Sequence, residues 1–139
     1  MAKQSGLGDY FACDNSAGSL KDISNDVTNL GVNVGQNLLD ITGLDKSAME
    51  RLIGLGDGSF AVSGVFNPSA NQAHSVFSTR SGTRTATYAI GGNTQGNSVL
   101  SMECLVGDYN QSRTADGMVA FTATLSLSNG TTPTWSTVA

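Results

Sequence analysis

The sequence predicts a small, mainly β protein. Charged residues make up 13% of the 139 residues, about half of the usual ~25%, while Gly, Ser, Thr and Asn are abundant. Apolar and polar residues alternate with a period of two in several segments, as in strands with one buried face. No apolar run approaches the ~20 residues of a membrane-spanning helix. The length fits a single domain, residues 1–139.

The first third of the chain predicts two strands, over 8–13 and 26–34. In the second, the side chains of positions 28, 30, 32 and 34 share one face. A helix is the competing interpretation of this region, but its Asn and Gly residues are poor helix formers. Residues 38–41 predict a further short strand.

Residues 40–58 predict a long loop between strands. Within them, residues 45–53 fit a short helical turn that is capped by Asp45 and stopped by Gly54. Loops of this length in compact domains are usually functional or mobile. We therefore expect this loop to have a role of its own.

One strand and the only helix follow the loop. Alternating apolar residues predict a strand over 58–66. The helix is expected over about 68–79, because Asn67 is a good N-cap and Pro68 fits the first helical position. An apolar stripe at helical spacing faces the core, and Gly82 ends the helix. The stripe consists of Ala70, Ala73, His74 and Phe77.

Three strands complete the predicted sheet, over 83–90, 98–109 and 118–128. The last is the clearest, because an apolar face alternates strictly with a face of Ala, Thr and Ser. The middle one has apolar residues on one face and a mixed opposite face. Asp-Gly pairs at 57–58 and 116–117 predict hairpin turns.

The charge is low and unevenly placed. The formal net charge is −4, from seven Lys and Arg against eleven Asp and Glu, and the acid excess lies in residues 1–58. No basic patch that could hold phosphates is visible, which argues against a nucleic-acid binder. The first six residues lack the apolar region of a signal peptide, so we expect cytosolic synthesis, with Cys13 and Cys104 reduced and buried.

No pattern in the sequence points to catalysis or a cofactor. The single histidine, His74, lies on the apolar stripe of the expected helix, where packing is its more common role. No Cys or His pair has metal-ligand spacing. The Gly-rich segment 54–58 precedes a strand and lacks a following Lys, so it does not fit a phosphate-binding loop. We expect no enzyme activity, no metal and no cofactor.

The second half of the chain resembles a known family. Its order is a strand ending in FNP, a helix with AHSV, the strand TATYAIGG, a long strand–turn–strand and a terminal PTWSTV. The most telling stretch runs from Asp108-Tyr109 through Arg113 to Gly117, and then through an alternating strand to Trp135. This arrangement resembles the major tail proteins, or tail tube proteins, of long-tailed bacteriophages.

The resemblance implies a β-sandwich or half-barrel with one flanking helix. Such subunits form rings, usually hexameric, and the rings stack into a hollow tube through which DNA is ejected. The implied location is the virion tail, after synthesis in the bacterial cytoplasm, with no membrane involved. The implied partners are further copies of the chain, the tape measure in the lumen, the tail terminator and the baseplate or tip.

Long loops bridge successive rings in this family, so the loop over 40–58 is the candidate inter-ring loop. The candidate contact residues are Asp40, Asp45, Lys46, Met49, Glu50, Arg51 and Leu52.

A wall of low charge suits a tube that double-stranded DNA passes without being bound. Lys and Arg would release counterions at each phosphate contact and hold the DNA, whereas Thr, Ser and Asn stay hydrated. The polar faces of 98–109 and 118–128 are therefore the candidate lining of the bore. The candidate residues are Ser101, Glu103, Thr122, Thr124 and Ser126.

Two other functions fit less well. A carbohydrate- or surface-binding β-sandwich would share the composition, but it should cluster exposed aromatic residues. Tyr10, Tyr88, Tyr109 and Trp135 are instead scattered along the chain. A small hydrolase would depend on the single His74. We expect Trp135 to be an anchor in the core or at an interface.

Overall fold

The computed structural model describes residues 7–139, as eight strands and one short helix. Residues 1–6, on which the expectation of no signal peptide rests, lie outside the described residues. The strands are Tyr10–Asp14 (β1), Leu20–Asp22 (β2), Val27–Asp40 (β3), Arg51–Val65 (β4), Arg84–Ala89 (β5), Ser98–Arg113 (β6), Val119–Leu127 (β7) and Trp135–Thr137 (β8). The helix is Ala73–Phe77 (α1). The prediction of a mainly β fold with one helix is confirmed.

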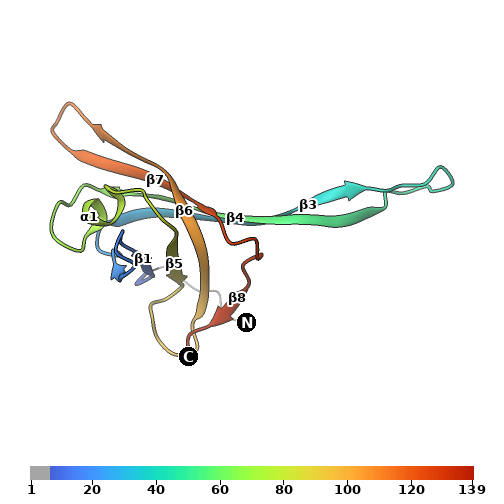
Figure 1. Cartoon of the computed structure of the whole chain (residues 1–139), viewed down its shortest axis with the longest axis horizontal. Helices are drawn as coiled ribbons and strands as arrows, with labels where there is room; N and C mark the ends of the chain where they lie inside the picture. Colours follow the sequence, from blue (N-terminus) through green and yellow to red (C-terminus); the bar gives the residue numbers. More distant parts are fainter. Residues whose placement is uncertain (1–6) are drawn as a thin grey trace.

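The strands of residues 7–139 form one antiparallel sheet that curls over its core. Their order is β2-β1-β5-β6-β7-β4-β3, and β8 pairs with the start of β6. β2 and β3 stand at opposite ends of this order, yet only residues 23–26 join them, so the sheet must bend until its edges approach (Figure 1). Across the curl, the ring centroids of Phe11 on β1 and Phe60 on β4 are 5.5 Å apart. Of the two expected forms, the half-barrel describes this curled sheet.

A single hydrophobic core fills the concave side of the sheet. The alternation read from 118–128 is confirmed, because Phe121, Ala123 and Leu125 are buried while the residues between them are exposed. Cys13 and Cys104 are buried free thiols, as expected, and burial raises the pKa of each to about 12. The other central members of the core are Phe11, Ile23, Phe60, Val62, Val76, Phe77, Leu100, Met102 and Val106.

The helix is shorter than the sequence predicts. α1 covers five residues instead of about 68–79. Asn71 adopts the left-handed backbone region, with φ at 64°, and this conformation interrupts any helix that begins before it. The N-cap is therefore Gln72 and not Asn67.

Two buried charged residues hold α1 against the sheet. The Oδ2 of Asp26 accepts a hydrogen bond from the Ala73 N–H at 3.0 Å, and its Oδ1 accepts one from Asn67 Nδ2 at 2.8 Å. The guanidinium of Arg84 donates to the Val76 carbonyl at 2.7 Å, near the other end of the helix. The contacts of Asp26 could not be predicted from a local pattern, because its partners lie more than forty positions away.

Residues 40–58 form part of a hairpin and are not one long loop. β3 and β4 pair over most of their length, and only residues 41–50 connect them. The hairpin leaves the body of the sheet and projects far beyond it, to the right in Figure 1. We call residues 36–56 the arm. The short strand expected over 38–41 is part of β3.

Two local predictions for this segment are wrong. The helical turn expected over 45–53 is absent, since residues 51–53 belong to β4 and no helix precedes them. The hairpin turn expected at 57–58 is also absent, because both residues lie inside β4. Residues 51–53 pair with residues 38–40 of β3, and this pairing satisfies their backbone groups in place of helical hydrogen bonds. The turn expected at 116–117 is confirmed, between β6 and β7, with Gly117 at a φ of 93°.

The start of β3 also differs from the expected alternation. A register shift between Val27 and Asn29 leaves Thr28 exposed, so Val27 packs against the core in its place. An extra residue in one strand changes which face each later side chain occupies. From Leu30 to Val34 the predicted face is confirmed.

Candidate bore and assembly surfaces

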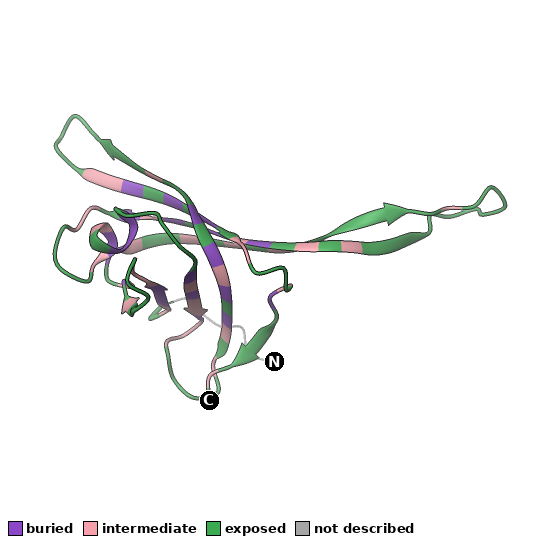
Figure 2. Cartoon of the chain, in the orientation of Figure 1, coloured by how far each residue is buried: buried purple, intermediate pink, exposed green. Residues whose placement is uncertain are grey.

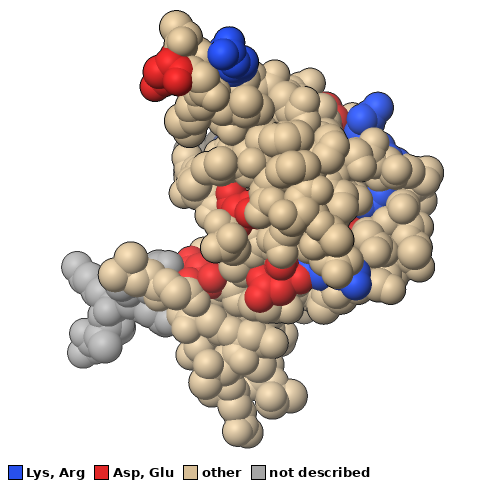
Figure 3. Space-filling view, turned by 90° about the vertical axis from the view of Figure 1, so that its left-hand side faces the viewer, with Lys and Arg blue, Asp and Glu red and all other residues tan. Residues whose placement is uncertain are grey.

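The face of the sheet turned away from the core is polar across β4, β6 and β7. We call it the outer face. Its residues are Asp57, Ser59, Ala61, Ser63 and Val65 on β4, Ser101, Glu103, Leu105, Asp108, Asn110 and Ser112 on β6, and Ala120, Thr122, Thr124 and Ser126 on β7. This surface carries three carboxylates and no Lys or Arg. Charged groups are also sparse on the side of the molecule seen in Figure 3.

The five residues predicted to line the bore all lie on the outer face. On β7, Thr122 is in register with Ser63 on one side and Asn110 on the other. Glu103 is half-buried and its carboxylate accepts a hydrogen bond from the Thr85 hydroxyl, whereas the other four residues are exposed. The fold therefore gathers these candidates, from two strands, into one continuous surface.

Small side chains hollow the outer face into a shallow groove of about 370 Å³. The groove runs over β3, β4 and β7, and its wall includes Gly31, Ala61, Ser63, Thr122 and Thr124. No long or basic side chain stands in it. The floor of this groove is therefore polar, and it lies close to the backbone because the side chains that line it are small.

A β-bulge at Gly107 keeps the outer face polar along β6. The register shifts between Val106 and Asp108, so that Asp108 faces outward and its Oδ1 accepts the Thr124 N–H at 3.1 Å. The shift turns Tyr109 toward α1, where its hydroxyl lies 3.0 Å from His74 Nδ1. The single histidine has the packing role that the sequence predicts.

The arm differs from the body because it exposes apolar side chains on both of its faces. Leu38 pairs directly with Ile53, and Leu39 pairs directly with Leu52. Directly opposed residues share a face, and successive pairs occupy opposite faces. These four side chains are between 46% and 66% exposed. Figure 2 shows the arm as exposed along its outer part.

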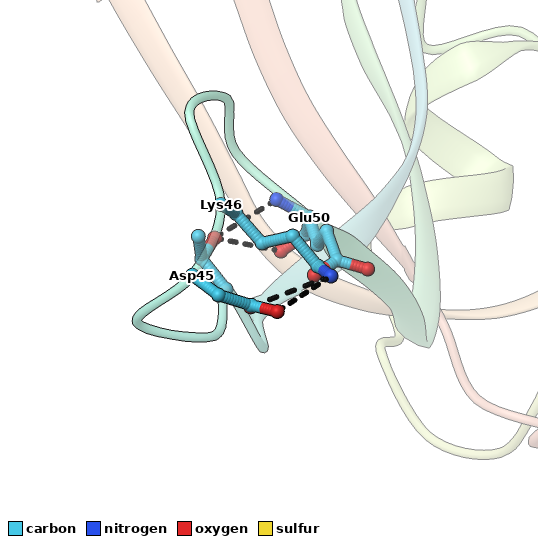
Figure 4. Close-up of polar contacts among 4 residues, drawn as sticks. Asp45, Lys46 and Glu50 are labelled. Atoms are coloured by element: carbon cyan, nitrogen blue, oxygen red, sulfur yellow. Dashed lines mark hydrogen bonds and ion pairs between the residues drawn. The ribbon is translucent and has the colours of Figure 1, made fainter.

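Polar contacts hold the tip of the arm (Figure 4). Asp40 Oδ1 accepts hydrogen bonds from the Thr42 hydroxyl at 2.7 Å and the Thr42 N–H at 3.0 Å, and these bonds lower the pKa of Asp40. The Glu50 N–H donates to the Thr42 hydroxyl oxygen at 2.8 Å. Lys46 and Asp45 form an exposed ion pair at 3.4 Å. The tip is a defined turn with its charges in solvent.

The seven predicted inter-ring residues all lie on the arm and are all exposed. The sequence analysis missed the neighbouring apolar residues that share this surface. They are Leu38, Leu39, Ile41, Leu44, Ile53 and Leu55. The sequence feature that could have identified them is the high density of large aliphatic residues in a segment assigned to a loop. Surface loops are usually polar, so this density was unusual.

Trp135 is exposed rather than buried. It lies on β8 opposite Leu100 and is 48% exposed, so the expectation of a core anchor is wrong. Among the described residues, the short β8 pairs only with the start of β6, so few neighbours cover it. The interface alternative stays a prediction.

The described residues offer no metal site, since no group of three or more His, Cys, Asp or Glu among residues 7–139 could hold an ion. Within the same range, no helix has the length and apolar character needed to cross a lipid bilayer.

Comparison with known proteins gives a clear result at the level of structure. No protein-family model matches the chain, and no curated protein matches its sequence. The tail of an empty GTA particle, solved with C6 symmetry, matches with a TM-score of 0.73 at 14% identity, over 99% of this chain and 100% of that one. The SPP1 tail tube matches with a TM-score of 0.72 at 10% identity, over 97% and 80%. The baseplate of the anti-feeding prophage matches with a TM-score of 0.64 at 10% identity, over 99% of each chain.

These likenesses place the chain in a structural class. At such low identity they show the fold alone, and that fold is the one seen in tail tubes. The resemblance read from the second half of the sequence is confirmed at this level and extends to nearly the whole chain.

Proposed function

We propose that this chain is the tube subunit of a phage-type tail, a structural, non-enzymatic protein of the virion. The observation that carries the proposal is the match of nearly the whole chain to subunits of assembled tails. Residues 1–139 act as one tail-tube-like domain in this proposal.

Copies of the chain join side by side into hexameric rings. β3 ends the sheet order, and among residues 7–139 no strand pairs with its outer edge, so this edge can offer backbone groups to another chain. Such edges pair readily with another chain, and head-to-tail contacts between identical subunits close into rings. The low charge of the chain reduces repulsion between the packed copies.

The arm joins one ring to the next. An isolated two-stranded ribbon is marginally stable in water, and this one exposes large aliphatic side chains. A second ring that covers the arm would remove this apolar surface from water. The predicted contact residues at the arm tip, from Asp40 to Leu52, serve this bridging role.

The outer face of β4, β6 and β7 lines the bore. Its Ser and Thr residues are hydrated and uncharged, and its carboxylates Asp57, Glu103 and Asp108 repel phosphate. Double-stranded DNA would pass this wall without the counterion release that makes basic surfaces bind it. The tape measure fills the lumen before ejection, and the terminator and the baseplate or tip cap the two ends of the tube.

The carbohydrate-binding alternative has little support in residues 7–139. The Tyr88 hydroxyl donates to Asp9 Oδ2 at 2.7 Å, and Tyr109 is engaged with His74. Trp135 on β8 and Tyr88 on β5 are both in register with Leu100, so the β6 strand separates them. An aromatic platform of the kind that stacks on sugars is not formed there.

Electron microscopy of the concentrated, purified protein tests the proposal. We expect hollow tubes in negative stain, with six-fold end views. Sedimentation at rising concentration should show rings or short stacks before long tubes. A chain that stays strictly monomeric at high concentration and binds glycans on an array would contradict the proposal.

A further inference from the structure

The sequence contains one Asn-Gly pair, Asn129-Gly130, and the structure places it in the exposed turn that follows β7. Two chemically related Asp-Gly pairs stand at 57–58 and 116–117. In each pair the glycine has no Cβ, so its backbone nitrogen can approach the side-chain carbonyl carbon of the residue before it. That approach is the first step of an intramolecular reaction that alters the backbone. The surroundings of each pair decide whether the step can occur.

The Asn129 side chain is folded back over the peptide bond that follows it. The Thr131 N–H donates a hydrogen bond to Asn129 Oδ1 at 3.1 Å, which makes an Asx turn. This bond holds the side-chain amide on the same side as the Gly130 nitrogen. It also withdraws electron density from the carbonyl carbon Cγ. The carbon is therefore positioned for attack and made more electrophilic.

The Gly130 nitrogen is available to make that attack. Among residues 7–139, no group accepts a hydrogen bond from the Gly130 N–H. Asn129 and Gly130 are both exposed, so hydroxide can reach this N–H and remove its proton. A Cβ placed at Gly130 would meet no atom within 4 Å beyond the chain neighbours, so the space around the nitrogen is open. The turn combines a free nucleophile with an accessible electrophile.

The two Asp-Gly pairs lack this combination. The Gly117 N–H donates a hydrogen bond to the Thr114 carbonyl at 3.0 Å. Gly58 is buried within β4, and its N–H donates to Asp57 Oδ1 at 2.8 Å. A carboxylate is also a poorer electrophile than an amide, and the hydrogen bonds that lower the pKa of Asp116 keep it ionised. Asn129 is therefore the reactive position of the three.

We infer that Asn129 is a self-modification site, at which the folded chain deamidates without an enzyme. The deprotonated Gly130 nitrogen forms a bond to Cγ of Asn129. The bond from Cγ to the side-chain nitrogen breaks, and that nitrogen takes a proton from water and leaves as ammonia. Water then opens the cyclic succinimide. Opening at Cγ gives aspartate, and opening at the backbone carbonyl gives isoaspartate, in which the main chain runs through the former side chain.

The turn begins a segment that packs against the base of the arm, so isoaspartate has a structural consequence. We call residues 128–134 the strap, which passes beside β4 toward β8 (Figure 1). Thr132 lies so close to Gly56 that a Cβ there would clash with it, and Pro133 packs tightly on Gly58. Isoaspartate adds one methylene group to the backbone of the strap. Close packing cannot absorb this extra length, so we expect the strap to loosen from β4.

Mass spectrometry of the native protein during incubation tests the site. Trypsin releases residues 114–139 as one peptide, and Asn129 is the only side-chain amide in it. At mildly alkaline pH this peptide should change in mass from amide to acid. A protein-isoaspartate methyltransferase should then label residue 129. The matched control, Asn129→Ser, keeps a turn-forming side chain without an amide, so its peptide should keep its mass.

A synthetic peptide with the sequence of residues 126–133 provides the rate for the unfolded segment. The folded chain should deamidate at least as fast as this peptide, because the Asx turn holds the reacting groups together. A folded chain that keeps the Asn129 amide while the peptide converts would show that the fold protects the site, and would overturn the inference. The inference does not depend on the proposed tube function, because the reaction occurs within a single chain.

Hydrogen exchange measures the effect on the base of the arm. The isoaspartate form should lose protection at residues 56–58, which pair with β3 in the unmodified chain. Fresh Asn129→Asp adds the charge without lengthening the backbone and should keep its protection. Unchanged protection in the isoaspartate form would refute the coupling between the strap and the arm. Equal loss in both forms would assign the effect to charge and would refute the role of backbone length.

Discussion

The β6–β7 hairpin and the arm are both long antiparallel ribbons, but they are stabilised in different ways. On β7, Phe121, Ala123 and Leu125 are buried and the residues between them face solvent, so this ribbon is stabilised by the core of its own chain. The arm has no buried residue between Gln36 and Leu55. Strict alternation therefore marks segments that one chain buries by itself. Exposed apolar residues on both faces mark a segment that its own chain does not bury.

Removing the arm should produce the largest difference between the two regions. Deletion of residues 38–53 joins Asn37 to Gly54, an Asn-Gly pair that favours a tight hairpin turn. We expect a folded monomer with the original cooperative unfolding and a complete loss of tube assembly. Chemical denaturation and electron microscopy measure the two effects. Normal tubes from this variant would refute the bridging role of the arm.

A pair of alanine substitutions contrasts the core with the arm directly. Phe60 is fully buried in the body, whereas Leu52 is exposed on the arm. Phe60→Ala should lower the free energy of unfolding of the monomer by about 3–5 kcal/mol. Leu52→Ala should change it by no more than ~0.5 kcal/mol. Urea denaturation at a concentration below the assembly threshold measures both values, and equal effects would contradict the division between body and arm.

Asp26 tests whether the body depends on buried polar contacts that the arm lacks. Asp26→Ala leaves the Ala73 N–H and the Asn67 amide without their acceptor, and an unsatisfied buried donor costs about 1–3 kcal/mol. We expect a monomer destabilised by about 2–3 kcal/mol, measured by urea denaturation. Asp26→Asn is the control, since its amide oxygen can still accept one of the two bonds. A loss as large as that of the alanine variant would mean that the negative charge, and not the hydrogen bond, matters.

The sequence predicted the body far better than the arm, for a physical reason. A strand such as β7 buries one face locally, so its period of two is visible in nine consecutive residues. The arm carries aliphatic residues on both faces and three nearby glycines, a pattern that also fits a loop or a broken helix. The contacts of Asp26 and the bulge at Gly107 depend on segments that are distant in the sequence. Contacts between residues that are far apart in the sequence leave no local pattern from which they could be predicted.

The candidate bore surface and the arm also differ in how much of each could be predicted from the sequence. Ser101, Thr122, Thr124 and Ser126 were predictable as one exposed face because alternation fixes the side of a strand. Which polar face of a subunit would line the proposed bore depends on the assembly and not on the single chain. Similarly, the exposure of the arm tip was predictable from its polar residues, but the two-sided apolar character of the arm required the register of β3 and β4.

Lysine substitutions on the outer face test the bore assignment within a strand of the body. Thr122→Lys with Thr124→Lys adds two positive charges per subunit to this polar surface, and each phosphate contact releases counterions. DNA ejection from particles that carry the variant should slow at low salt and recover as salt is raised. Thr122→Ser with Thr124→Ser should leave ejection unchanged. Unaltered ejection in the lysine variant would place this face away from the bore.

The smallest expected effect compares the tips of the two hairpins. Asp40 begins the tip of the arm and Asp116 lies in the β6–β7 turn. The hydroxyl of Thr42 or Thr114 is the main cause that lowers the pKa of each carboxyl below its ordinary 3.8, and a backbone N–H adds to it. Because the folded pKa is lowered, each carboxylate stabilises its turn above pH 3.8 and loses that effect as the pH falls through the lowered pKa.

Carbon-detected NMR titration of the monomer measures both carboxyls in one sample. Thr42→Val removes the hydroxyl donor, so the pKa of Asp40 should rise toward its ordinary value while that of Asp116 stays lowered. Thr114→Val should give the reverse result. Both turns are exposed, so protonation of Asp40 or Asp116 should not itself change the stability of the body. A coupled change of both pKa values would mean that the tips communicate through the sheet, and the arm would then not be energetically separate from the body.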